Sequence, residues 1–301
     1  MSRDTPKVHT IDLDFLGKKS GIAAFLVELD QGPILVETGP HSTLPTLEKG
    51  IIKAGYQLDD IKHVLITHIH LDHAGAAWCF AEKGATIYLH PKGYRHMHDP
   101  AKLLASAKMI YKEKMDMLWG TLKPIDESQL VIVEHLESVK IGSSTFTAHH
   151  TPGHAQHHIA WQLDDIVFTG DVAGVSINNG PVIPPCPPPD INRELWLSSI
   201  DHLLTLTDIK QYYLTHFGLI ENITEHMMEL RGAIKAYTDF MKPYAETEKS
   251  LAETLPEFRT FVKSYLMDHG LNQKDADAYE AANPLDMSAA GLLRYWKKRM
   301  V

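Results

Sequence analysis

Short runs of apolar and β-branched residues, separated by turns rich in glycine, proline or polar residues, recur along the first 220 residues. Runs of this length between such turns are typical of β-strands. We therefore expect strands at residues 8–15, 23–29, 34–37, 63–67, 86–90, 130–134, 139–147, 158–163, 166–169 and 212–215. Gly142-Ser143-Ser144 interrupts one of these segments and predicts a hairpin or a bulge there.

Apolar residues spaced three and four apart predict helices between these strands. One helix starts at a cap formed by Ser42, a second covers 74–82, and a third has Asp190 as its N-cap and buries Leu195 and Trp196. Strand, helix and strand in this order indicate βαβ units, so the pattern predicts an α/β protein.

Two further segments are helical throughout in their pattern. Residues 92–122, rich in Met, Lys and His, predict a helical insertion, and residues 221–301 predict a C-terminal helical subdomain behind a first domain at 1–220. The stretch 181–189, hereafter the Pro-rich loop, must be a stiff loop because proline lacks an amide donor. The insertion and the Pro-rich loop are candidate walls of a substrate site, with plain packing and a rigid connector as the alternative roles.

The most informative chemistry lies in residues 67–73, Thr-His-Ile-His-Leu-Asp-His, directly after the apolar segment 64–66. His68, His70, Asp72 and His73 are side chains that bind Zn²⁺ and similar ions. A histidine-rich surface tract that binds metal without function is the alternative interpretation.

Three more candidate ligands lie further along the chain, each where a predicted strand runs into a polar turn. They are His154 after Pro152-Gly153, Asp171 after Gly170, and His216 before Phe217-Gly218. Glycine beside a ligand lets the backbone approach a site closely. A surface tract carries no such partners, so the sequence favours a built metal site.

These motifs resemble the metallo-β-lactamase-fold superfamily, whose signature is His-x-His-x-Asp-His followed by a histidine, a bridging aspartate and a last histidine. The resemblance implies a four-layer αββα sandwich. C-terminal helices are also found in the glyoxalase II-like and broad-specificity hydrolase branch. The resemblance further implies that His68, His70 and His154 hold one metal, that Asp72, His73 and His216 hold a second, and that Asp171 bridges the two metals. Glu37-Thr38-Gly39 stands where many relatives have Asp-Thr-Gly, so Glu37 is expected to orient a ligand loop without binding metal.

The activity that this resemblance implies is hydrolysis by a hydroxide shared between two divalent ions, Zn²⁺ first, with Fe and Mn open. Asp72 and Asp171 are the expected catalytic carboxylates. The expected substrates are an ester, a lactone or a thioester. Gly174 counts against acyl-homoserine lactones, because lactonases that cleave them tend to have Tyr there. A mononuclear-iron persulfide dioxygenase and a non-catalytic metal-binding protein are the alternatives.

The composition of the chain limits the classes of partner that we expect it to bind. A net charge of −9 argues against nucleic acid and against an anionic membrane, since both need clustered Lys and Arg. The two cysteines, Cys79 and Cys186, form no disulfide framework, and neither a secretory signal nor a long apolar span is evident. We expect a cytoplasmic protein with a small-molecule substrate, and a homodimer stays open.

Overall fold

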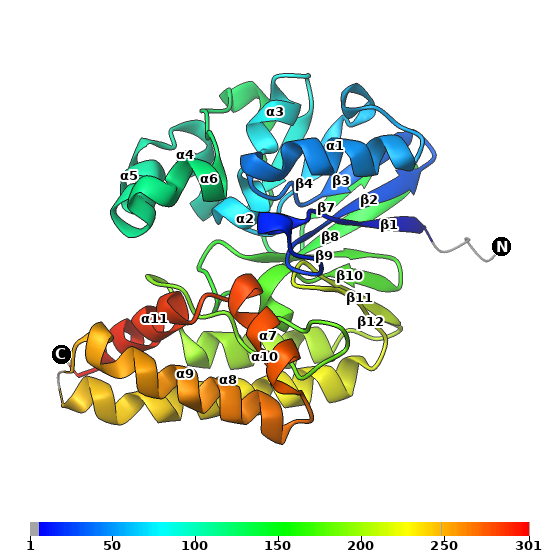
Figure 1. Cartoon of the computed structure of the whole chain (residues 1–301). Coiled ribbons are helices and arrows are strands. Elements are labelled where there is room, and N and C mark those ends of the chain that lie inside the picture. The colour runs from blue at the N-terminus through cyan, green and yellow to red at the C-terminus, as the bar shows by residue number, and fades with distance from the viewer. Residues whose placement is uncertain (1–5, 248, 301) are drawn as a thin grey trace.

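Two six-stranded sheets lie face to face at the centre of the molecule (Figure 1) in the computed structural model, which describes residues 6–247 and 249–300. The first sheet has the order β1-β2-β3-β4-β5-β6; it is antiparallel from β1 to β3 and parallel from β3 to β6. Its strands are β1 (Lys7–Asp12), β2 (Ala23–Leu29), β3 (Gly32–Val36), β4 (His63–Leu65), β5 (Thr86–Leu89) and β6 (Leu130–Ile132).

The second sheet has the order β12-β11-β10-β9-β8-β7 and is antiparallel except for the β10–β11 pair. Its strands are β7 (Ser138–Ile141), β8 (Ser144–His150), β9 (Ile159–Leu163), β10 (Ile166–Phe168), β11 (Gln211–Leu214) and β12 (Gly218–Ile220). The expected interruption at Gly142 is a hairpin turn between β7 and β8.

Helices cover the outer face of each sheet, and three more form the insertion. Those near the first sheet are α1 (Leu44–Lys53), α2 (Leu71–Ala74) and α3 (Ala77–Ala81). The insertion contains α4 (Pro91–His98), α5 (Ala101–Tyr111) and α6 (Met115–Trp119). The helices near the second sheet are α7 (Arg193–Leu204), α8 (Ile223–Glu246), α9 (Leu251–Asp268), α10 (Gln273–Ala282) and α11 (Leu285–Lys297).

Three buried apolar clusters separate these layers. One lies between the sheets and includes Phe25, Trp161 and Phe168. A second joins the first sheet to the helices outside it, and a third joins the second sheet to α7, α8, α9 and α11. Helix, sheet, sheet and helix therefore stack in four layers, which confirms the expected fold class (Figure 1).

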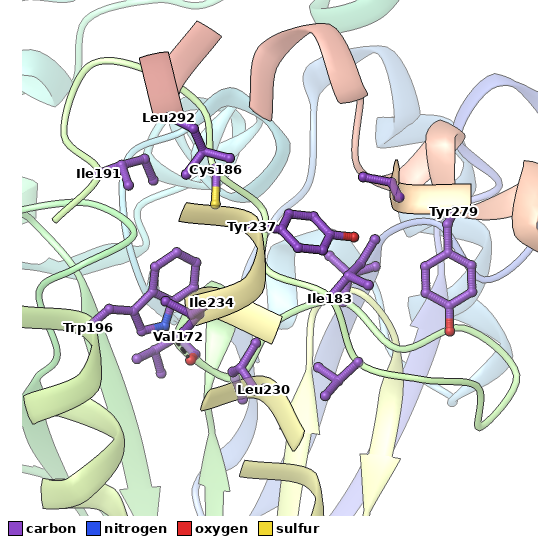
Figure 2. Close-up of a cluster of buried hydrophobic side chains, with 14 of the residues drawn as sticks. Val172, Ile183, Cys186, Ile191, Trp196, Leu230, Ile234, Tyr237, Tyr279 and Leu292 are labelled. Atoms are coloured by element: carbon purple, nitrogen blue, oxygen red, sulfur yellow. Dashed lines mark hydrogen bonds between the residues drawn. The ribbon is translucent and has the colours of Figure 1, made fainter. Parts of the chain in front are cut away.

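The C-terminal helices share the third cluster with the second sheet and with the Pro-rich loop. Figure 2 shows Leu230 and Tyr237 of α8 and Leu292 of α11 around Ile183 and Cys186 of that loop. Cys186 is fully buried, so the loop is an internal packing element as well as a connector. Within the described part of the chain, no helix combines the length and apolar character needed to cross a bilayer.

Three local predictions were wrong. Ser42 does not cap α1, because the N-cap is Thr43 and the Ser42 hydroxyl donates to the Leu118 carbonyl at 2.6 Å. The helix expected at 74–82 is divided into α2 and α3, because Ala76 N–H donates to Gly39 C=O at 3.0 Å instead of continuing one helix. The cap of α7 is Asn192, whose side chain accepts from Leu195 N–H at 3.0 Å, and Leu195 itself is 42% exposed. Asp190 is consequently free for another role.

Candidate metal centre

Four loops, each of which follows the end of a strand, carry the seven predicted ligands. The loop after β4 and the first turn of α2 carry His68, His70, Asp72 and His73. The other three follow β8, β10 and β11, and they are His154, Asp171 and His216. The structure brings all seven together; five of them are buried, while His70 and Asp72 are partly exposed.

Three imidazoles form the first group. His70 Nδ1 lies 2.9 Å from His68 Nε2 and 3.0 Å from His154 Nε2. His68 and His154 are each only 1% exposed. Three ring nitrogens that face one point in a dry environment match the histidine ligand set of a zinc-type ion.

Asp72, His73 and His216 form the second group. Asp72 Oδ2 lies 3.8 Å from His73 Nε2 and 3.6 Å from His216 Nε2. Asp171 lies between the two groups: its Oδ1 is 3.2 Å from His73 Nε2, and its Oδ2 is 3.2 Å from His154 Nε2. One carboxylate oxygen therefore faces each group, which is the arrangement that a bridging ligand needs.

Two buried atoms at the junction lack any hydrogen-bond partner among the described residues, namely His73 Nε2 and Asp171 Oδ1. An unsatisfied buried polar atom is costly, and natural proteins tolerate it where an ion or a function compensates. The ligand chemistry and these two atoms together fit a pair of divalent ions.

Two of the ligand rings donate a hydrogen bond to a backbone carbonyl through the nitrogen that faces away from the centre. His154 Nδ1–H donates to Pro185 C=O at 2.9 Å, and His216 Nδ1–H donates to Gly21 C=O at 2.7 Å. Each bond places the proton on Nδ1 and leaves Nε2 with a free lone pair toward the centre. The Pro-rich loop is thus part of the metal centre through Pro185.

Glu37 supports ligands of both groups. Its Oε1 accepts from His73 Nδ1–H at 3.0 Å and from Thr67 Oγ1–H at 2.5 Å. Thr67 Oγ1 in turn accepts from His68 Nδ1–H at 3.0 Å. The longer side chain therefore reaches the position expected from the motif, and a single carboxylate orients one histidine of each group.

Replacing Glu37 by Gln is expected to weaken the binding of both ions by about 10- to 100-fold. The amide offers one oxygen only. With that oxygen in the Oε1 position, its NH₂ group faces the Thr67 backbone N–H that Oε2 otherwise accepts at 3.3 Å; in the reverse orientation, the NH₂ group faces both Thr67 Oγ1 and His73 Nδ1. Metal content after dialysis against graded chelator measures the change. Glu28→Gln is the control, because Glu28 bonds Lys7 and His9 away from the centre; equal losses in both variants would contradict this role.

Burial and neighbouring charges shift the pKa values of the two groups in opposite directions. Burial, followed by repulsion from His154, lowers the pKa of His70 to about 3, and the pKa of His68 falls well below its usual value for similar reasons. Burial also acts to lower the pKa of His73, but Asp171, Glu37 and Asp72 outweigh it and raise that pKa. The histidines of the first group are therefore neutral and ready to bind a cation, whereas the surrounding carboxylates draw His73 and His216 of the second group toward the protonated form.

A cavity of about 430 Å³ opens onto the ligands. Its floor includes His70, Asp72, Asp171 and His216. The walls come from the insertion, the Pro-rich loop and the α10–α11 connection, and they include Leu103, Ile110, Tyr111, Trp119, Pro187, Pro188, Pro189, Pro284 and Met287. The two candidate walls named from the sequence thus both line the cavity, together with C-terminal residues.

Several polar groups of this cavity were missed from the sequence, among them His157 and Asp190. His157 lines the cavity, and its Nε2 lies 4.0 Å from Oδ2 of Asp190, the residue expected as a helix cap. By contrast, His149 and His150 have structural partners, Gln162 and the Val133 carbonyl respectively. The spacing from His154 to His157 was visible in the sequence, but nothing there showed which of the neighbouring histidines faces the cavity.

The sequence profile of the metallo-beta-lactamase superfamily matches residues 18–216, which is well over half of the chain and includes all seven ligands. The chain belongs to this superfamily. The metallo-beta-lactamase fold-containing protein ST1585 of Sulfurisphaera tokodaii is 28% identical over 179 residues, which are 58% of this chain and 67% of that protein. The lactamase-like protein aptB of Emericella nidulans is 30% identical over 154 residues, 50% of this chain and 40% of aptB.

Solved superfamily structures share the fold over nearly the whole chain. ST1585 superposes with a TM-score of 0.67, covering 96% of this chain and 99% of its own. The metallo-beta-lactamase family protein TTHA1429 of Thermus thermophilus gives a TM-score of 0.70, with coverages of 97% and 94%. Both are 19% identical in these superpositions, so they establish the fold, including the C-terminal helices, and nothing about the substrate.

Position 174 is a glycine in this chain, where lactonases of the superfamily tend to have a tyrosine, and the reason is steric. The φ of Gly174 is +77°, and a Cβ there would lie 2.7 Å from Val182 Cγ2 and 2.9 Å from the Ile183 carbonyl oxygen. The Pro-rich loop packs against this position, so a tyrosine has no room. Any hydroxyl donor in the cavity must come from another element.

Proposed function

We propose that this protein is a hydrolase that uses two divalent metal ions, Zn²⁺ first, to cleave a small ester, lactone or thioester. The observation that carries the proposal is the shared position of Asp171 between two complete ligand groups at the floor of a cavity. Two ions held there would supply hydroxide near neutral pH and polarise the acyl oxygen. Superfamily membership supports the same reaction type.

Each residue around the two ions would then have a distinct role in the reaction. Asp171 would hold both ions with its two oxygens, and Asp72 would hold one while accepting a proton from the attacking water. Burial acts to raise the pKa of Asp72, but His73 and His216 outweigh it and lower that pKa, which keeps the carboxylate ionised. Glu37, Pro185 and Gly21 would keep the ligand rings fixed during turnover.

The walls support a small, largely uncharged acyl compound as substrate. Apolar side chains and prolines form most of the lining, with Lys102 as its one lysine or arginine among the described residues. Apolar walls with few polar groups suit a small organic ligand better than a polyanion. The two complete groups favour the dinuclear hydrolase over a mononuclear iron oxygenase, which needs only one of them.

A metal count combined with a substrate panel tests the proposal. Protein from cells grown without added metal is expected to contain two ions per chain and to hydrolyse members of a panel of alkyl and p-nitrophenyl esters, lactones and glutathione thioesters. Chelation should abolish this activity, and Zn²⁺ or Mn²⁺ should restore it. One iron per chain, with oxygen uptake on glutathione persulfide and no hydrolysis, would establish the alternative instead.

A further inference from the structure

One face of α5 forms a wall of the cavity. Its lining residues are spaced by three and four, which places them on one side of a helix, and they are Lys102, Leu103, Ser106, Ala107, Ile110 and Tyr111. Leu103, Ala107 and Ile110 offer methyl groups to the cavity, and Ser106 offers a small hydroxyl. Tyr111, at the C-terminal end of α5, is the largest polar side chain of this face.

Aromatic packing fixes the Tyr111 ring. It meets Trp119 of α6 edge-on, with ring centroids 5.1 Å apart at 67°, and Trp119 stacks on Phe15 at 5.6 Å and 21°. Phe15 belongs to the buried cluster outside the first sheet. The contacts among these three rings therefore hold the Tyr111 phenol against the first sheet and its helices, although Tyr111 belongs to the inserted segment.

The Tyr111 hydroxyl has no hydrogen-bond partner within the described residues, although the side chain lines the cavity together with Asp72 and His216. Burial first, and then the carboxylates of Asp72 and Asp286, raise the pKa of this phenol well above its ordinary value. The group thus keeps its proton at physiological pH, and among the described residues it donates that proton to neither carboxylate. These surroundings leave a cavity ligand as the acceptor for its free O–H.

Hydrolysis of an oxygen ester needs such a donor, whereas hydrolysis of a thioester or a p-nitrophenyl ester does not. An alkoxide is a strongly basic leaving group that departs readily only when it receives a proton, while thiolates and nitrophenolate depart as stable anions. The seven metal ligands and Glu37 leave this proton donor unassigned. In the position where some relatives carry a tyrosine, Gly174 has no room for one.

We propose that Tyr111 is the catalytic acid that protonates the alkoxide leaving group, and that the enzyme is therefore built for alkyl esters and lactones rather than thioesters. This inference rests on the proposed hydrolase function. Hydroxide forms a bond to the acyl carbon, the bond from that carbon to the leaving oxygen breaks, and the Tyr111 Oη proton passes to that oxygen. The products are a carboxylic acid and an alcohol. Asp72 takes the proton of the next water, which becomes the next hydroxide, and this proton restores the Tyr111 phenol.

The test compares wild-type protein with Tyr111→Phe on butyrate esters that differ only in their leaving group: p-nitrophenyl, trifluoroethyl, benzyl and ethyl, together with the S-ethyl thioester. We expect Tyr111→Phe to lose about 100-fold in kcat on the ethyl and benzyl esters and little on the p-nitrophenyl ester and the thioester. Tyr94→Phe is the matched control, because Tyr94 lies in the same insertion and its hydroxyl bonds Glu127 at 3.3 Å. The control should behave as wild type on every ester.

A binding measurement gives a second readout that does not depend on turnover. Benzyl alcohol, the product of the benzyl ester, should bind Tyr111→Phe several-fold more weakly than wild type in calorimetric titration, as expected for one lost hydrogen bond. Metal content and melting temperature should be unchanged. An equal loss on all leaving groups, or no loss on any, overturns the inference while leaving the hydrolase proposal standing. Failure of the wild type to cleave any ester, lactone or thioester overturns both, whereas cleavage of thioesters alone overturns only the inference.

Discussion

Asp171→Asn protein is expected to fold but to hold less metal and to lose about a thousandfold or more in kcat/KM, since bridged ions contribute several kcal/mol to such a transition state. The amide supplies one neutral oxygen in place of the two charged oxygens that face His73 and His154. It also places an N–H donor against one of the two groups. Elemental analysis and initial rates on the best ester of the panel measure both effects.

His150→Ala is the control for this experiment. His150 belongs to the same histidine-rich part of the sequence, but its Nε2 bonds the Val133 carbonyl at 2.9 Å and it is absent from the ligand groups. Metal content and activity should stay near wild type. Similar losses in the two variants would mean that the ligand set is wrong.

Gly291→Ala is expected to destabilise the protein by about 1–3 kcal/mol, because the new methyl group has no space. A Cβ at this position of α11 would lie 2.0 Å from the Cys186 carbonyl oxygen and 2.8 Å from the Pro187 carbonyl carbon. These are backbone atoms of the Pro-rich loop, so α11 or the loop must move. Since Pro185 in that loop holds His154, affinity for the first ion should also fall.

Gly232→Ala provides a matched comparison in α8. Gly232 is also helical, but it is exposed, and a Cβ there would have open space around it, with no contact within 4 Å beyond the backbone of its own helix. The same substitution there should stabilise the helix by up to about 1 kcal/mol. Chemical denaturation of both variants with metal bound checks the pair. A neutral or stabilising Gly291→Ala would show that α11 does not pack against the loop as described.

The strands and the residues that meet in the candidate metal centre were predictable because their signals are local. Short apolar runs between turns determine where β2 and β9 lie, and the ligand motif places four coordinating side chains within six residues. The position of Glu37 could be inferred from the turn that contains it. Its simultaneous contact with Thr67 and His73 could not, since that requires two distant segments to meet.

Other features depend on groups that the sequence does not distinguish. Every residue has a carbonyl, so no pattern indicates that Pro185 and Gly21 supply the oxygens behind His154 and His216. The division between α2 and α3 has the same origin, because backbone hydrogen bonds to Gly39 compete with the helix. Which histidine near His154 reaches the cavity likewise follows from tertiary packing.

The cavity walls and the metal ligands come from different stretches of the chain. The ligands sit in loops anchored by strands of the two sheets, whereas α5, the Pro-rich loop and the α10–α11 connection supply most of the wall. Substitutions in the wall segments can therefore change the shape of the cavity without disturbing the residues of the candidate metal centre. Residues of the wall can therefore change during evolution independently of the residues of the candidate metal centre. Pro185 is the exception, because it lines the cavity and its carbonyl also holds His154.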